Sequence, residues 1–61
     1  MIIYITAENL SYGDLGTLNK DNVVVKGTSE NAVAIAAEDI PCGSMVHIDR
    51  NGYIRRYRLP S

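Results

Sequence analysis

The sequence predicts an all-β protein, folded as one small barrel or sandwich. Short runs rich in β-branched and aromatic residues recur along the chain, and turn-forming residues separate them. The chain has 61 residues, enough for a single domain that spans 1–61. A domain of that length buries only about 60% of the surface that its unfolded chain exposes. Asn51-Gly52 lies between the last two runs, where this pair favours a tight hairpin.

About five or six short strands are expected from these runs. The first four ranges are 2–6, a weaker 15–18, 22–26 and 32–37. In the fourth range, Val33 and Ile35 alternate with alanines, which gives one bulky and one small face. Alanine favours helices, but this alternation and the nearby Pro41 favour a strand. We find no segment that repeats another, so the chain is expected to be one unit without an internal repeat.

The C-terminal hairpin is expected to join residues 45–50 to residues 53–58. A two-residue type I′ turn would place Arg50 opposite Tyr53, and this pairing fixes the register of both strands. The core side chains would then be Val46, Ile48, Tyr53 and Tyr57, with Arg50 and Arg55 at its rim. The outer face would carry His47, Asp49, Ile54, Arg56 and Arg58, with Arg56 close to Asp49.

Composition limits the class of protein further. The 46% of hydrophobic and 21% of charged residues are typical of a globular chain. We see neither a secretory signal nor an apolar run long enough to cross a membrane, so synthesis in the cytoplasm is expected. Cys42 is the only cysteine, which rules out an intrachain disulfide. Because the core is thin, we expect added stability from copies of the chain or from a larger surface.

No group of residues in the sequence predicts catalysis, a metal site or a cofactor. His47 lacks an evident nucleophile beside it, Cys42 lies in a turn without a nearby cation, and the glycines form no phosphate-binding motif. We therefore expect a protein that is not an enzyme. The segment 55–58 alternates arginines with a tyrosine, as nucleic-acid binders do, but the isoelectric point of about 5.6 argues against that partner.

Residues 34–46, AIAAEDIPCGSMV, preceded by DNVVV at 21–25, resemble two groups of β proteins. One is the SAF or β-clip module, in which an alanine-rich strand leads through Asp-Ile-Pro-x-Gly into another strand. The other is the group of small capsid decoration, or cement, proteins of tailed bacteriophages. SAF modules usually accompany a larger enzymatic or sugar-binding domain, for which this chain has no room, so the resemblance favours decoration. The resemblance to SAF modules also implies that the barrel has a β-clip-like form.

The resemblance implies a structural viral protein on the outside of the virion capsid, which it stabilises after synthesis in the host cytoplasm. Its expected partners are the major capsid protein and copies of itself, a homotrimer being favoured. The candidate interface residues are Ile2, Ile3, Tyr4, Arg55, Arg56 and Arg58. Two alternatives remain open: a β-clip module that binds a carbohydrate or other small ligand, and a small phage-encoded inhibitor of a host protein.

Overall fold

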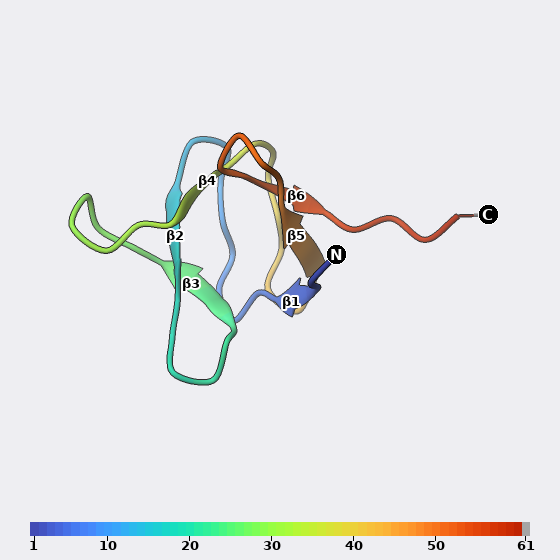
Figure 1. The fold of residues 1–61 in the computed structure, drawn as a ribbon, viewed down its shortest axis with the longest axis horizontal. Helices are drawn as coiled ribbons and strands as arrows, with labels where there is room; N and C mark the ends of the chain where they lie inside the picture. Colours follow the sequence, from blue (N-terminus) through green and yellow to red (C-terminus); the bar gives the residue numbers. More distant parts are fainter. Residues whose placement is uncertain (61) are drawn as a thin grey trace.

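A computed structural model describes residues 1–60, and the regular elements in this range are all β-strands (Figure 1). Each strand contains at least one β-branched or aromatic residue, and most of the turns contain a glycine. The six strands within 1–60 are β1 (Tyr4–Ile5), β2 (Leu15–Leu18), β3 (Val24–Lys26), β4 (Ala34–Ala36), β5 (Met45–Ile48) and β6 (Tyr53–Arg56). The all-β prediction is therefore confirmed. Over the same residues, no helix has the length and apolar character that crossing a bilayer requires.

The strands form one sheet that curls into a nearly closed barrel (Figure 1). The order in the sheet is β1-β5-β6-β4-β2-β3, and the neighbours run antiparallel except for the parallel pair β4 and β6. A parallel bridge between Thr6 and Val24 joins the two outer strands and closes the ring. The bridge covers strand edges that would otherwise be open to pairing with other chains.

The pleat of each strand decides which side chains fill the barrel. In β4, Ala34 and Ala36 point inward and are buried, whereas Ile35, and Val33 just before the strand, are exposed. The small alanines allow β4 to lie close to its neighbours β2 and β6. The buried apolar side chains are Leu10, Val24, Ala34, Ala36, Ile40, Val46 and Ile54.

The barrel is built from two halves that repeat each other with an offset of 30 residues. The strands β1, β2 and β3 correspond to β4, β5 and β6, and the pairing of Tyr4 with Val46 corresponds to that of Ala34 with Gly16. We refer to residues n and n + 30 as twins. The twins Leu10 and Ile40 pair with each other, and each amide donates to the other's carbonyl oxygen, at 2.8 and 2.7 Å. The approximate twofold axis therefore passes between these two residues.

Side chains repeat this symmetry at the strand ends. The carboxylate of Glu8 accepts the amide hydrogen of Lys26 at 2.9 Å, and its twin Glu38 accepts that of Arg56 at 3.1 Å. The expectation of a chain without an internal repeat is therefore wrong. Between residues 3–27 and 33–57 the identical twins are only Ile5 and Ile35, Ala7 and Ala37, Glu8 and Glu38, and Gly13 and Gly43.

The C-terminal hairpin forms, but its register differs by one residue from the predicted one. Ile48 pairs with Ile54, and His47 pairs with Arg55. The reason is that the turn contains the three residues 50–52 instead of two, and its last residue, Gly52, has a φ of +85°. A type I turn that ends in a left-handed residue is the usual form of a three-residue hairpin loop.

The side chain of Asp49 stabilises this longer turn. Its Oδ1 accepts the amide hydrogens of Asn51 at 2.9 Å and of Tyr53 at 3.0 Å. In the first hairpin, its twin Asn19 accepts the corresponding amides of Asp21 and Val23 at 2.8 and 3.3 Å. An aspartate or asparagine that accepts hydrogen bonds from the backbone two residues on is a recognised device for holding turns.

The shifted register corrects the predicted faces of β6. Ile54, which was expected on the outer face, is fully buried, and Tyr53, expected in the core, is 40% exposed. Tyr57 is half-buried at the end of the hairpin. Val46 is buried as predicted, and Ile48 packs partly buried against the core. A shift of one residue has this effect because alternate side chains of a strand point to opposite faces.

Candidate functional site

A shallow hollow of about 460 Å³ lies on the outside of the second half, over β4 and β6. Two tyrosines, an isoleucine and an arginine give it its chemical character. Tyr12 is 76% exposed, and Tyr53 and Ile35 are about 40% exposed. The lining residues are Tyr12, Gly13, Ile35, Ala36, Ala37, Tyr53 and Arg55. We refer to this site as the aromatic hollow.

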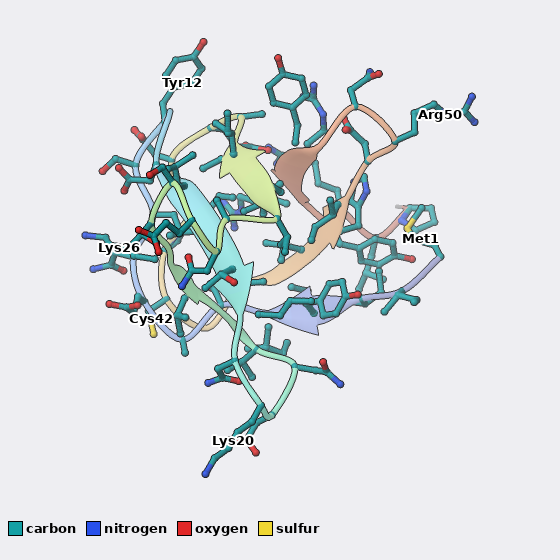
Figure 2. The ribbon with its side chains drawn as sticks, turned by 60° about the vertical axis from the view of Figure 1, so that its left-hand side comes forward. Met1, Tyr12, Lys20, Lys26, Cys42 and Arg50 are labelled. Atoms are coloured by element: carbon teal, nitrogen blue, oxygen red, sulfur yellow. The ribbon has the colours of Figure 1, made fainter. Side chains whose placement is uncertain are left out.

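The strand registers place these side chains together. Ile35 of β4 pairs with Tyr53 of β6, and both point outward because Ala36 and Ile54, which follow them, point into the core. Tyr12 comes from the turn before β2, where it projects from the barrel (Figure 2). The hollow therefore combines residues from both halves of the chain.

Arg55 is held at the rim of the hollow by two contacts. Its Nε donates a hydrogen bond to Asp49 Oδ2 at 2.9 Å, and its guanidinium lies 5.5 Å from the centre of the Tyr53 ring. The bond from Arg55, with the backbone amides of Tyr53 and Asn51, lowers the pKa of the Asp49 carboxyl. The expected outer pairing of Arg56 with Asp49 is thus wrong, because the register brings Arg55 there instead. A cation over an aromatic face is a common arrangement in binding sites.

The turn that carries Tyr12 is fixed from the other half. The amide of Tyr12 donates to Asp39 Oδ1 at 2.8 Å, and the amide of its twin Cys42 donates to Asn9 Oδ1 at the same distance. Both turns therefore have the same backbone support. The exposed phenol ring of Tyr12 is not needed for that support, since a cysteine occupies the same position in the other turn.

The other side chains of the hollow also differ from those at the equivalent surface of the first half. The twins of Tyr53 and Arg55 are Val23 and Val25, which leave an aliphatic surface around Ile5. The backbone pairing is equivalent at both places, because Thr6 pairs in parallel with Val24 as Ala36 pairs with Ile54. Because the fold forms with either set of side chains, the aromatic and cationic residues are not required for folding. The aromatic and cationic side chains therefore distinguish the hollow from its counterpart in the other half.

The predicted N-terminal interface residues lie on the opposite edge of β5 from β6. Ile2 and Ile3 are exposed, at 68% and 37%, while Tyr4 is half-buried and packs against the core. They continue into the exposed Ile5 and into Met45, its partner across the strands. We refer to Ile2, Ile3, Ile5 and Met45 as the N-terminal patch.

The predicted basic residues divide between two places. Arg55 borders the aromatic hollow, whereas Arg56 follows on β6 and Arg58 lies in the extended tail beyond it (Figure 1). Arg58 Nη2 donates to Glu38 Oε1 at 3.2 Å. The Arg58 side chain is 72% exposed, so this ion pair contributes little to stability. The side chains of Arg56 and Arg58 are thus both exposed to solvent.

Sequence reasoning missed Tyr12 and Ile35 as site residues and placed Tyr53 in the core. The available signal was the repeated pattern Ala-Glu-x-x-x-x-Gly at 7–13 and 37–43, which aligns the two halves and shows where they differ. Cys42 is exposed. Within residues 1–60, no three His, Cys, Asp or Glu side chains lie close enough to hold a metal ion.

Searches with this chain against protein-family models, curated proteins and solved structures found no match.

Proposed function

We propose that the protein is a structural decoration protein, which binds the outside of a tailed-phage capsid and stabilises it by burying surface between the two. The resemblance of residues 34–46 to such proteins directs this choice of partner. The observation that carries the proposal is the amount of large apolar side chain left outside the barrel.

More large apolar side chains are exposed in residues 1–60 than are buried. Apart from alanines, the buried ones are Leu10, Val24, Ile40, Val46 and Ile54. The exposed ones are Met1, Ile2, Ile3, Ile5, Tyr12, Val33, Ile35, Met45, Tyr53 and Leu59. Scattered apolar residues are normal on a surface, but contiguous groups mark interaction sites. Seven of these ten residues belong to the N-terminal patch or the aromatic hollow, which supports a protein partner at both.

The two sites suit different parts of an interface. The aromatic hollow offers a concave apolar floor with a cation at its rim, which fits an apolar side chain next to an acidic one. The N-terminal patch is aliphatic, and neighbouring capsid subunits or copies of this chain could cover it. Arg56 and Arg58 add charge complementary to an acidic capsid surface, chiefly by steering association.

Binding to capsids tests the proposal. Purified protein is mixed with expanded shells of the major capsid protein from the same genome, and the bound fraction is measured by sedimentation and cryo-electron microscopy. We expect saturable binding at fixed symmetry positions. Tyr12→Ser should weaken it at least about tenfold if the ring is a buried anchor. Cys42→Ser, the matched change at the twin position, should leave it within about twofold. Absence of binding, or equal effects of both changes, would contradict the proposal.

The charged and oligomeric parts have separate tests. Arg56→Glu with Arg58→Glu should slow binding and reduce its dependence on salt. An unchanged capsid occupancy would remove these arginines from the interface. Light scattering of the purified chain should give the mass of a trimer, and a stable monomer would exclude the trimer while leaving capsid binding open.

A small-ligand function is the second candidate, and the aromatic hollow is the observation that favours it. Tyrosine faces beside an arginine can stack on a sugar ring and donate hydrogen bonds to its hydroxyls. Titration of the protein with a panel of mono- and disaccharides, followed by amide chemical shifts, would detect it. Shifts confined to the hollow would favour this reading, and an unchanged spectrum would exclude these sugars as its ligands.

A further inference from the structure

The interface between the two halves is self-complementary, like that of a twofold dimer. The strand pairs that cross between the halves are β1 with β5 and β2 with β4, and Leu10 with Ile40 completes them. Each of these contacts has its twin. An interface with this symmetry is the isologous kind that two identical subunits form. Here the chain joins both sides of it through a single linker, residues 28–32.

The linker has to cross one strand to connect the halves. Gly27 at its start donates its amide to Leu15 of β2 at 2.8 Å, and Val33 at its end donates to the next residue, Gly16, at 2.9 Å. Since β3 and β4 lie on opposite sides of β2, the linker spans about 10 Å, or two strand spacings. Within the linker, the amides of Asn31 and Ala32 donate to the carbonyl oxygen of Thr28, which forms a compact turn.

We infer that the halves of this chain recognise each other as separate units, so that two copies exchange halves when the linker cannot turn back. In the exchanged pair, the first half of one copy meets the second half of the other. All strand pairs of the barrel are kept, and the losses are the turn within 28–32 and the hydrogen bond that Thr17 Oγ1 donates to the carbonyl oxygen of Asn31. This inference concerns assembly of the barrel and does not depend on what the barrel binds.

Linker length decides between the two forms. A short flexible linker gives its two ends an effective concentration of the order of millimolar, which favours closure within one molecule at ordinary protein concentrations. Removal of Ser29, Glu30 and Asn31 leaves only two residues between Gly27 and Val33, so three Cα-to-Cα steps connect them. Three steps reach only about 10 Å at full extension, with no length left to rise over β2. The shortened chain can then complete a barrel only with a second copy.

The test uses the chain with residues 29–31 deleted. We expect light scattering to give an even number of chains, with the dimer as the smallest unit, and the amide spectrum to match that of the full chain except near the linker. In a sample mixed from isotope-labelled and unlabelled chains, contacts between Leu10 and Ile40 methyl groups should be intermolecular. The control replaces residues 28–31 by Gly-Ser-Gly-Ser, which keeps the length and should leave the oligomeric state of the full chain unchanged.

Two results would overturn the inference. A folded shortened chain in which the contact between Leu10 and Ile40 remains within one molecule would show that the linker does not need to cross β2 in the way described. An unfolded shortened chain, beside a folded length-matched control, would show that a half does not recognise the other half of a second copy.

Discussion

The two halves of the barrel make the same turns and strand pairs with mostly different side chains. Gly13 and Gly43 both adopt a left-handed φ, +88° and +85°, at the turns that lead into β2 and β5. Glu8 and Glu38 both accept an amide hydrogen at a strand end. Positions that agree between the halves in this way are the ones that the fold requires.

The halves also differ on the outer surface, where the difference gives the aromatic hollow its side chains. Tyr53 and Arg55 of the second half occupy the positions of two valines, 23 and 25, in the first half. Tyr12 of the first half occupies the position of Cys42 in the second half. Each half is thus an internal control for the other. Four changes, ordered by the size of the expected effect, test which positions are equivalent and which have diverged.

The largest effect is expected at the axis between the halves. Leu10 and Ile40 are 2% and 1% exposed, so Leu10→Ala and Ile40→Ala should each lower the free energy of unfolding by about 2–5 kcal/mol. A loss of that size is comparable with the whole stability of a small domain. Urea denaturation should give similar losses for the two variants. A loss confined to one of them would contradict the equivalence of the halves.

Gly16 is a point where the halves have diverged inside the core. A Cβ at this position would lie 2.5 Å from the Cδ1 atom of buried Ile54, so Gly16→Ala should cost about 1–3 kcal/mol. The twin of Gly16 is Val46, and the twin of Ile54 is the smaller Val24. Ile54→Val removes the clashing methyl group, and it should therefore recover part of the loss in the double variant. Strictly additive costs in a double-mutant cycle would contradict this contact.

The two hairpin turns should respond differently to pH. The pKa of Asp49 is lowered in the folded state, chiefly by Arg55, so its stabilising effect is complete above the unfolded value of about 3.9. It is lost as the pH falls through the lower, folded value. Asp49→Asn keeps the acceptor that its twin Asn19 uses but loses the ion pair. The variant should be less stable than the parent near neutral pH, and the difference should vanish in acid. Urea midpoints that differ equally at both pH values would contradict this role.

The smallest effect is expected at the left-handed turn residue of the second hairpin. Its twin Asn22 has a φ of +59°, so the backbone already holds an asparagine in that conformation. Gly52→Asn should therefore cost less than about 1 kcal/mol. Gly52→Val should cost clearly more, because a β-branched side chain is strained at positive φ. Equal thermal shifts for the two variants would show that the turns are not equivalent.

Much of the fold could be predicted because it depends on local chemistry. β-branched runs and turn residues located all six strands of residues 1–60. The hairpin register could not be predicted from Asn51-Gly52 alone, because the Asp49 side chain stabilises a three-residue loop. The repeat was missed because its twins share backbone role more than identity: Leu10 and Ile40 differ in type, and Gly16 and Val46 differ in size as well.

The site was harder to predict than the fold, because it depends on that register. The basic residues at 55, 56 and 58 were recognised from composition, but the shift by one residue decides that Arg55 meets Asp49 and that Tyr53 faces outward. Tyr12 lies 41 positions before Tyr53 in the chain, so only the folded barrel brings them to one hollow.

Hydrogen exchange at the two axis amides tests the equivalence of the halves most directly. The amide of Leu10 donates to the carbonyl oxygen of Ile40, and the amide of Ile40 donates to the carbonyl oxygen of Leu10. If the halves form one cooperative barrel, both amides should exchange only on global unfolding, with equal free energies that match the value from urea denaturation. A much smaller opening free energy for one amide than for the other would contradict the equivalence of the halves.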